Sequence, residues 1–365
     1  MATRKLGLTS GSACVALALL AGCSGGLQST TPAGTTPQSR FQASSHIALG
    51  SLRGPISKLS AVRTLHSSGD LIFRNPDPDA ASGYVSGSSF YGAVELWTLP
   101  DSKNNAPDCS IATEYVNDLA FDAKGTLWVP TPINPTSGAG VVYTYPKGSC
   151  TAAKFQLTAA NGQPADIAFG TKDEYVSYIL GLPNGSTYLN GSIDVFADKK
   201  TAPSANLTNP NIVESLGIAV DDKNDIFWSG LSAIGSGTSS VVEFAGGKGK
   251  GKLLALTGFG EIVGLDMDKD QDLVAADAEN TTLDIWKPPY KGKPTSTIAL
   301  QGSPIDVKLD KANKNVYVSD VANSTIDVYT YPEGKYEYSI SNGFTATGSE
   351  PIQVIGVAVS LPGPQ

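Results

Sequence analysis

The sequence predicts an all-β fold, a six-bladed β-propeller with four strands in each blade. Its 365 residues include 39 Gly and 23 Pro, 41% are hydrophobic and only 16% are charged. This composition is typical of short strands joined by tight turns, and it excludes a helical bundle or a disordered chain. In addition, one short apolar strand recurs six times with periods of 42 to 51 residues. Periods of this length indicate a propeller or a solenoid.

The recurring strand is the first strand of each repeat. Its six copies are expected at 117–122, 165–170, 216–221, 263–268, 305–310 and 355–360. After each of the first five copies come a turn, a second apolar strand and a third, as at 272–277 and 283–289 in the fourth copy. A more variable fourth strand follows, for example at 296–300. Four strands joined by Gly, Asn, Asp and Pro turns form a propeller blade.

The two ends of the repeat array complete each other. The copy at 355–360 has no strand after it, whereas 70–74 and 94–100 resemble a second and a third strand with no first strand before them. Pairing the C-terminal strand with the N-terminal ones closes the ring and protects sheet edges that would otherwise aggregate. We therefore expect a propeller over 69–365 with five whole blades and one split blade.

The N-terminal region has a different composition, because the first 69 residues contain no Asp or Glu. Arg4 and Lys5 precede an apolar run at 13–20. A run of this length is too short to span a bilayer core of about 30 Å as a helix. We therefore expect residues 1–22 to be a secretion signal peptide.

The tetrad Leu20-Ala21-Gly22-Cys23 resembles the lipobox of bacterial lipoproteins. This resemblance implies that Cys23 is lipidated, with palmitate-type chains, and that the chain is extracytoplasmic and anchored to the bilayer of the cell envelope. The next residue is Ser24 instead of Asp, which by the sorting pattern of such lipoproteins favours the outer membrane in cells that have one. Residues 23–68 are rich in Ser, Thr and Pro and are expected to form a flexible tether.

Charge and histidine content exclude several functions. The formal net charge is −8, and a nucleic-acid partner would need a basic surface. The only two histidines, His46 and His66, precede the predicted propeller. The propeller therefore has no histidine to act as a general base or a zinc ligand.

Two blades carry a fuller motif. The segments 272–286 and 315–329 resemble NHL propeller repeats in their order of strand, Asp, Asn and strand. The matching residues are Asp277 and Asn280 in one, and Asp320 and Asn323 in the other. The resemblance implies a propeller, but such propellers include enzymes and binding platforms, so it does not choose between them.

The aligned first strands also give candidate channel residues. The fourth position of the six copies is Ala in four of them and Asp266 or Lys308 in the other two. Neighbouring blades place these two charges in one register, so we expect them to pair across the channel wall. They are either a structural ion pair or a pair that contacts a ligand.

Three carboxylates occupy the second position of these strands, namely Asp118, Asp166 and Asp306. If the first strands begin at one mouth of the channel, these carboxylates lie together there. Clustered carboxylates repel one another or bind a hard cation such as Ca²⁺. The alternative interpretation is that Asp suits the tight turn that leads into each strand.

An enzymatic hypothesis comes from 117–129, which is similar to a strand of the gluconolactonase or regucalcin-like six-bladed propellers. That family holds a divalent metal with a Glu, an Asn and an Asp from different blades. Asn117 matches the Asn position, but the family's early Glu motif and its Pro-Asp-Gly motif are absent, the nearest being Pro164-Ala165-Asp166. The resemblance thus supports one of three metal ligands.

Two cysteines remain in the predicted propeller, Cys109 and Cys150. They enter the outer strands of successive blades, in a compartment that would permit disulfides. A bond requires Cα atoms within about 7 Å, and outer strands splay apart, so a disulfide and two free thiols both stay open.

These patterns favour a tethered, non-catalytic module that binds a small polar ligand, a glycan or an envelope protein. The alternative is a metal-dependent lactonase or hydrolase that uses Asn117 and nearby carboxylates.

Overall fold

The computed structural model describes the chain from residue 83 to residue 360, with short gaps. The described ranges are 83–101, 103–113, 115–131, 140–151, 156–159, 161–181, 183–184, 187–197, 200–346 and 348–360. The predicted signal peptide, Cys23 and the tether lie outside these ranges. Within them, no helix has the length and apolar character needed to cross a membrane.

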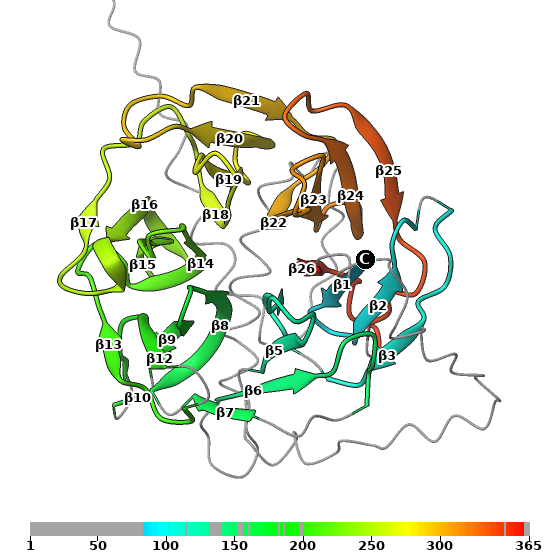
Figure 1. Cartoon of the computed structure of the whole chain (residues 1–365), viewed down its shortest axis with the longest axis horizontal. Coiled ribbons are helices and arrows are strands. Elements are labelled where there is room, and N and C mark those ends of the chain that lie inside the picture. The colour runs from blue at the N-terminus through cyan, green and yellow to red at the C-terminus, as the bar shows by residue number, and fades with distance from the viewer. Residues whose placement is uncertain are drawn as a thin grey trace, which may run out of the picture. The chain divides into compact units, whose positions relative to one another are not determined.

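Six four-stranded antiparallel sheets form a ring, which confirms the predicted six-bladed propeller (Figure 1). Blade 1 contains β4 (Ala120–Phe121), β5 (Leu127–Thr131), β6 (Gly140–Tyr145) and β7 (Gln156–Ala159). Blade 2 contains β8 (Gly162–Phe169), β9 (Asp173–Gly181), β12 (Ser192–Ala197) and β13 (Ala205–Leu207), with a hairpin of β10 (Pro183–Asn184) and β11 (Thr187–Tyr188) inserted between β9 and β12.

The next three blades follow the same order. Blade 3 contains β14 (Glu214–Val220), β15 (Ile226–Ala233), β16 (Ser236–Phe244) and β17 (Lys252–Leu253), with a short 3₁₀ turn, η2 (Ala245–Gly247), after β16. Blade 4 contains β18 (Ile262–Met267), β19 (Leu273–Asp277), β20 (Thr282–Trp286) and β21 (Ser296–Ala299). Blade 5 contains β22 (Pro304–Leu309), β23 (Asn315–Asp320), β24 (Thr325–Thr330) and β25 (Tyr336–Ile340).

The closing blade joins the two ends of the described chain. Its strand order is β26 (Val354–Val359), β1 (Tyr84–Ser89), β2 (Val94–Thr98) and β3 (Cys109–Ile111). The predicted closure by the C-terminal strand is therefore present, and β2 falls in the expected third strand. The second strand is β1, however, and not 70–74, which lie outside the described residues.

Crowding around β1 explains why its sequence lacks the apolar pattern from which the other strands were predicted. Its sequence, YVSGSS, has few apolar residues because neighbouring side chains leave no space for them. A Cβ atom at Gly87 would lie 2.6 Å from Ile326 Cδ1 and 2.8 Å from Phe344 Cζ. Small residues are therefore required where this strand meets blade 5.

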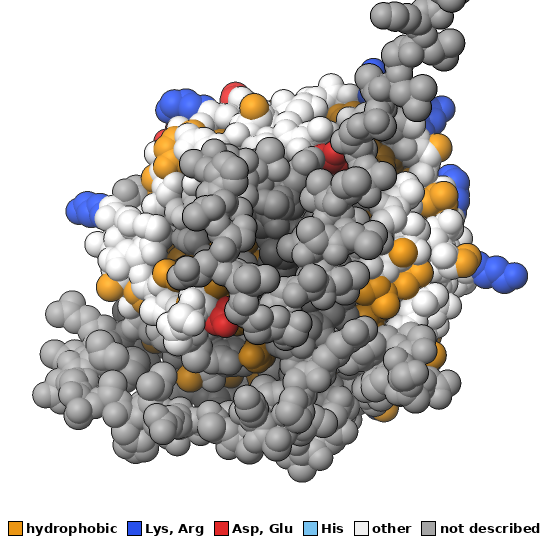
Figure 2. Space-filling model, turned by 180° about the vertical axis from the view of Figure 1, so that it is seen from behind, with side chains coloured by type: hydrophobic (Ala, Val, Ile, Leu, Met, Phe, Trp, Pro, Cys, Tyr) orange, Lys and Arg blue, Asp and Glu red, His pale blue; other side chains and the backbone are white. Residues whose placement is uncertain are grey.

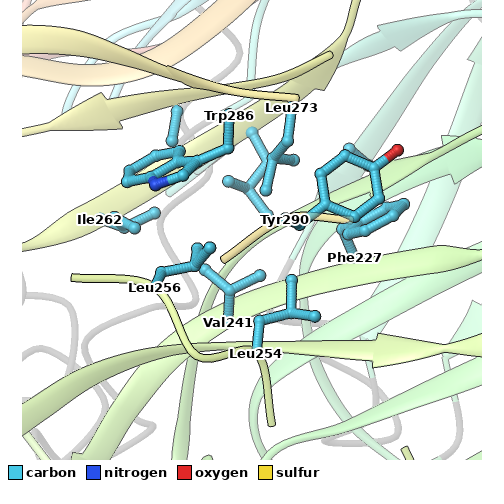
Figure 3. Packing of buried hydrophobic residues seen from close by; sticks show 11 residues of the cluster. Phe227, Val241, Leu254, Leu256, Ile262, Leu273, Trp286 and Tyr290 are labelled. Atoms are coloured by element: carbon cyan, nitrogen blue, oxygen red, sulfur yellow. The ribbon is translucent and has the colours of Figure 1, made fainter. Parts of the chain in front are cut away.

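Apolar side chains from facing sheets form the core between blades. Between blades 3 and 4, for example, Phe227 and Val241 pack with Ile262, Leu273 and Trp286, and all five are at most 2% exposed (Figure 3). The indole N–H of Trp286 donates to the carbonyl of Gly292 at 3.0 Å, so its one polar atom is satisfied. Burial of these side chains holds adjacent sheets together.

The NHL-like Asp residues tie loops together and have partners within the fold. The Asp277 carboxylate accepts hydrogen bonds from the backbone N–H groups of Gly260 and Glu261 and from the Asn280 side chain, at 2.7, 3.0 and 2.8 Å. Asp320 has the same arrangement with Ser303 and Asn323. These residues thus join each hairpin to the loop that enters the inner strand.

The structure contains the disulfide Cys109–Cys150, with the Cα atoms 6.0 Å apart. It links β3 of the closing blade to the loop after β6 of blade 1. Outer strands of adjacent blades are therefore closer here than their general splay suggests.

Replacing both cysteines by Ser is expected to lower the free energy of unfolding by about 4 kcal/mol. A cross-link over a sequence separation of 41 residues removes roughly that much chain entropy from the unfolded state. Chemical denaturation of the oxidised protein and the variant measures the difference. Reductant should weaken the wild type and leave the variant unchanged, and a wild type insensitive to reductant would contradict the bond.

Candidate functional site

The site begins with an irregularity that recurs at the start of the inner strands. In β8, β14, β22 and β26 one extra residue interrupts the pairing with the second strand, at Ala165, Leu216, Ile305 and Ile355 respectively. In β18 the register shifts between Ile262 and Leu265. Such β-bulges re-aim side chains. Here the bulged residues line a cavity at the channel mouth. Leu216, Val263, Ile305 and Ile355 also pack in one apolar cluster.

Serines of the second strands hold these bulges against the next blade. Ser229 Oγ donates to the Val263 carbonyl at 2.5 Å, and Ser319 Oγ donates to the Ile355 carbonyl at 2.5 Å. Ser88 Oγ, in the closing blade, donates to the carbonyl of Val116 at 3.1 Å. Neither the bulges nor these serines were expected from the sequence, although a Ser recurs near the centre of the second strands, for example at Ser177, Ser229 and Ser319.

The resulting pocket lies at the axis, on the face where the inner strands begin, and its empty volume is about 630 Å³ including the part open to solvent. Its walls are mainly aliphatic or aromatic, and polar groups stand at its rim and floor. The lining residues are Phe90, Asn117, Asp118, Ala165, Ile179, Glu214, Ser215, Leu216, Val263, Gly264, Ile305, Asp306 and Ile355. A concave apolar site with a few convergent polar groups is the usual form of a ligand pocket.

A charged layer forms the floor. Lys308 Nζ lies 3.1 Å from Asp118 Oδ2 and 2.9 Å from Asp306 Oδ1, and both carboxylates are at most 5% exposed. Asp118 Oδ1 accepts from the N–H of Leu119 and Asp306 Oδ2 from the N–H of Val357, at 2.6 and 2.9 Å. Most of the hydrogen-bonding capacity of the floor is therefore used within the fold.

The third predicted carboxylate, Asp166, is buried beside the floor and does not line the pocket. Its Oδ2 accepts from the N–H of Ile218 at 2.8 Å, and within the described structure its Oδ1 is buried without a hydrogen-bond partner. Burial, with the charge of Asp166, raises the pKa of Asp118 well above its usual value, against the opposing effect of Lys308. Burial also raises the pKa of Asp166. The three carboxyls therefore lie together as expected, with Asp118 and Asp306 in the floor of the pocket at the channel mouth and Asp166 buried beside them.

The predicted ion pair between Asp266 and Lys308 is wrong. Asp266 instead accepts hydrogen bonds from the backbone N–H groups of Leu309 and Met267, at 2.7 and 2.8 Å. The long side chain of Lys308 extends from its own position in the strand to the floor of the pocket. There its ammonium pairs with both Asp118 and Asp306. Asp266 and Lys308 do line one cavity, on the far side of this layer, together with the alanines of the inner strands.

Strand crowding separates the two cavities. A Cβ atom at Gly264 would lie 2.6 Å from Asp306 Cα, and one at Gly356 would lie 2.7 Å from Asp118 Cα. The backbones of neighbouring inner strands therefore touch at this layer, which explains why this position is either Asp or Gly in all six inner strands.

The residues predicted as metal ligands were the clustered carboxylates and Asn117, and the carboxylates pair with Lys308 instead. In the described part of the chain, no group of three or more His, Cys, Asp or Glu residues is placed to hold a metal ion. The Lys308 ammonium itself stands between the carboxylates of Asp118 and Asp306. Asn117 lines the pocket, and its Nδ2 is buried without a partner among the described residues.

No family model and no curated protein matches this chain. Solved structures are similar to it, among them a chain from a nidogen/laminin complex, with a TM-score of 0.58 and 15% identity over 77% of this chain and 99% of that chain. A protein of unknown function from Bacteroides caccae has a TM-score of 0.57 and 10% identity over 76% of this chain and 99% of its own. At these identities the similarity shows the fold alone, and the NHL-like and gluconolactonase-like family assignments stay predictions.

Replacing Lys308 by Met is expected to lower the free energy of unfolding by about 3–5 kcal/mol, since it leaves buried carboxylates without their counter-charge. Adding Asp306→Asn or Asp118→Asn to this variant should recover part of the loss, and adding Asp266→Asn should recover less. The loss should also shrink as the pH falls and the buried carboxyls become protonated. Urea unfolding of the single and double variants at two pH values measures this. Full recovery with Asp266→Asn alone would contradict the observed pairing.

Proposed function

We propose that the chain is a non-catalytic binding module whose ligand enters the pocket at the channel mouth. The observation that carries this proposal is the bulge-lined apolar wall, formed by Leu216, Val263, Ile305 and Ile355 around one axis. The repeated bulges gather these side chains at one end of the axis, where they pack in a cluster with Phe90 and also form the wall of the cavity. The floor carboxylates are held by Lys308 and backbone N–H groups, so they supply shape and charge to a ligand and are not free to react.

A metal-dependent lactonase is the alternative, and Asn117 favours it. Asn117 lines the pocket at the position that resembles a metal ligand of the gluconolactonase-like propellers, and a metal would bind its Oδ1. Against it stands the Lys308 ammonium between the nearest carboxylates, since a divalent cation there would have to displace it.

The neutral fluorescent probe 1-aminoanthracene tests the pocket as a ligand site. We expect saturable binding of one probe per chain, because the pocket is apolar, and we expect Val263→Trp to abolish it by filling the pocket. Val220→Trp, at a partly buried position of the cavity beyond the charged layer, is the matched control and should leave probe binding intact.

Lactone hydrolysis is measured on the same proteins with added Ca²⁺ or Zn²⁺. Metal-dependent turnover that Asn117→Ala abolishes would favour the enzyme over the binding module. Absence of saturable probe binding would overturn the pocket as a ligand site.

We also propose that Cys23 carries a lipid and tethers the propeller to the cell envelope, as the lipobox-like tetrad suggests. The chain enters the described propeller at β1, whose first residue, Tyr84, pairs with Thr98 at the end of the ring opposite the pocket. An anchor attached there would leave the pocket face free for a ligand or an envelope protein.

Phase partition with Triton X-114 tests the anchor. The protein made in a bacterial host should enter the detergent phase, and Cys23→Ala should move it to the aqueous phase. Cys14→Ala, within the predicted signal, is the control and should not change the partition. Wild type in the aqueous phase would contradict lipidation.

A further inference from the structure

Lysines are segregated to one face of the propeller. Of the seventeen lysines among the described residues, all except Lys308 lie in the loops that follow a first or a third strand, or on the first residue of a fourth strand. Examples are Lys124, Lys223 and Lys311 after inner strands, and Lys287 after a third strand. These connections share the face opposite the pocket. In Figure 2 the visible lysine side chains stand at the outer edge, and apolar and acidic side chains also lie further in.

The pocket face has carboxylates without cationic partners. Glu214 lines the pocket, Glu261 is at the equivalent position of the next blade, immediately before β18, and Glu279 lies in the β19–β20 turn. Every ion pair among the described residues involves Lys269, Lys287, Lys308 or Lys335, and none includes these glutamates. Their negative charge is therefore not balanced within the described fold.

Burial and mutual repulsion act on the two inner glutamates. Burial raises the pKa of Glu214 to about 7, and burial together with the charges of Glu279, Glu214 and Asp277 raises that of Glu261 to about 7. Glu214 is 2% exposed, and its Oε2 accepts a hydrogen bond from the N–H of Gly235. A buried carboxylate without a counter-charge lowers stability, so a bound cation would relieve a repulsion that is already present.

The order of groups along the pocket fixes the orientation of such a cation. Glu214 and Glu261 stand two residues before Leu216 and Val263, nearer the open rim, and the aliphatic ring lies below them. The floor already has its own ammonium, that of Lys308. A ligand that complements the glutamates, the aliphatic ring and the Lys308 floor has an apolar body in the pocket and its positive charge beside the glutamates.

We propose that the pocket binds a small amphipathic amine, with its aliphatic body against Leu216, Val263 and Ile305 and its ammonium group at Glu214, beside Glu261. This inference rests on the proposed function of the pocket. The lysine side chain of a partner protein has the same chemistry but enters with its ammonium first, which would place that charge in the aliphatic ring near Lys308. The geometry thus favours a free amine over a lysine side chain.

Isothermal titration of the full mature chain with hexylammonium, hexanol and hexanoate tests the charge preference. At pH 8 we expect hexylammonium to bind more tightly than hexanol, and hexanoate to bind most weakly. Glu214→Gln keeps an acceptor for the Gly235 N–H but removes the charge. It should weaken hexylammonium binding by about tenfold or more and leave hexanol binding unchanged.

The pH dependence gives a second measurement. The ionised form of Glu214 attracts the ammonium, so the affinity for hexylammonium should fall as the pH drops from 8 to 5.5, and that for hexanol should not. Glu279→Gln, on the exposed turn, is the matched control and should change either affinity less than Glu214→Gln does.

The outcomes distinguish this inference from the proposed function. Equal binding of hexylammonium and hexanol, or tighter binding of hexanoate, would overturn the amine preference while leaving the pocket as a ligand site. Tighter binding of the peptide Gly-Lys-Gly than of hexylammonium would overturn the orientation in favour of a lysine side chain. Failure of all these ligands and of 1-aminoanthracene to bind would overturn the proposed function itself.

Discussion

The convergence of six inner strands on one axis is the constraint on which this structure depends. At the level of Asp118 and Gly264 the strand backbones are in contact, so only glycine or a side chain that bonds to the neighbouring backbone is accommodated. Asp166 and Asp306 use their carboxylates to accept N–H groups of the next blade. One layer further along, four alanines line the far cavity together with Asp266 and Lys308. Packing at the axis therefore determines both the ring and its two separate cavities.

Much of the fold was predictable from the sequence, because each blade repeats the alternation of buried and exposed residues. The six inner strands, the closure by 355–360 and the third strand near 94–100 all follow from that period. The strand β1 was not predictable in this way, since Gly87 and its serines carry no hydrophobic signal. Its identity depends on contacts with Ile326 and Phe344, more than 200 positions away in the chain.

The site was predictable in composition and less so in geometry. The alignment of the inner strands predicted that Asp118, Asp166 and Asp306 lie together, and in the structure they form one buried group. The aligned strands could not show that the Lys308 ammonium pairs with Asp118 and Asp306. An alignment of strands predicts where Cα atoms lie, but it does not predict how far a long side chain reaches. The bulges were also hidden. One extra residue per strand changes which side chain faces the axis, and this change is visible only once the pairing partner is known.

The split blade has a consequence for how the protein is made. Tyr84 and Ser88 bond to Ser360 and Gly356, partners 276 and 268 residues away, so the first described strand has no inner neighbour until nearly the whole chain exists. Contacts between such distant segments form slowly, because a long loop must close first. Until β26 pairs with β1, the inner edge of β1 stays unpaired, and an unpaired edge can bind another strand. Closure of the ring therefore requires β26, which pairs with β1 across a sequence separation of more than 260 residues.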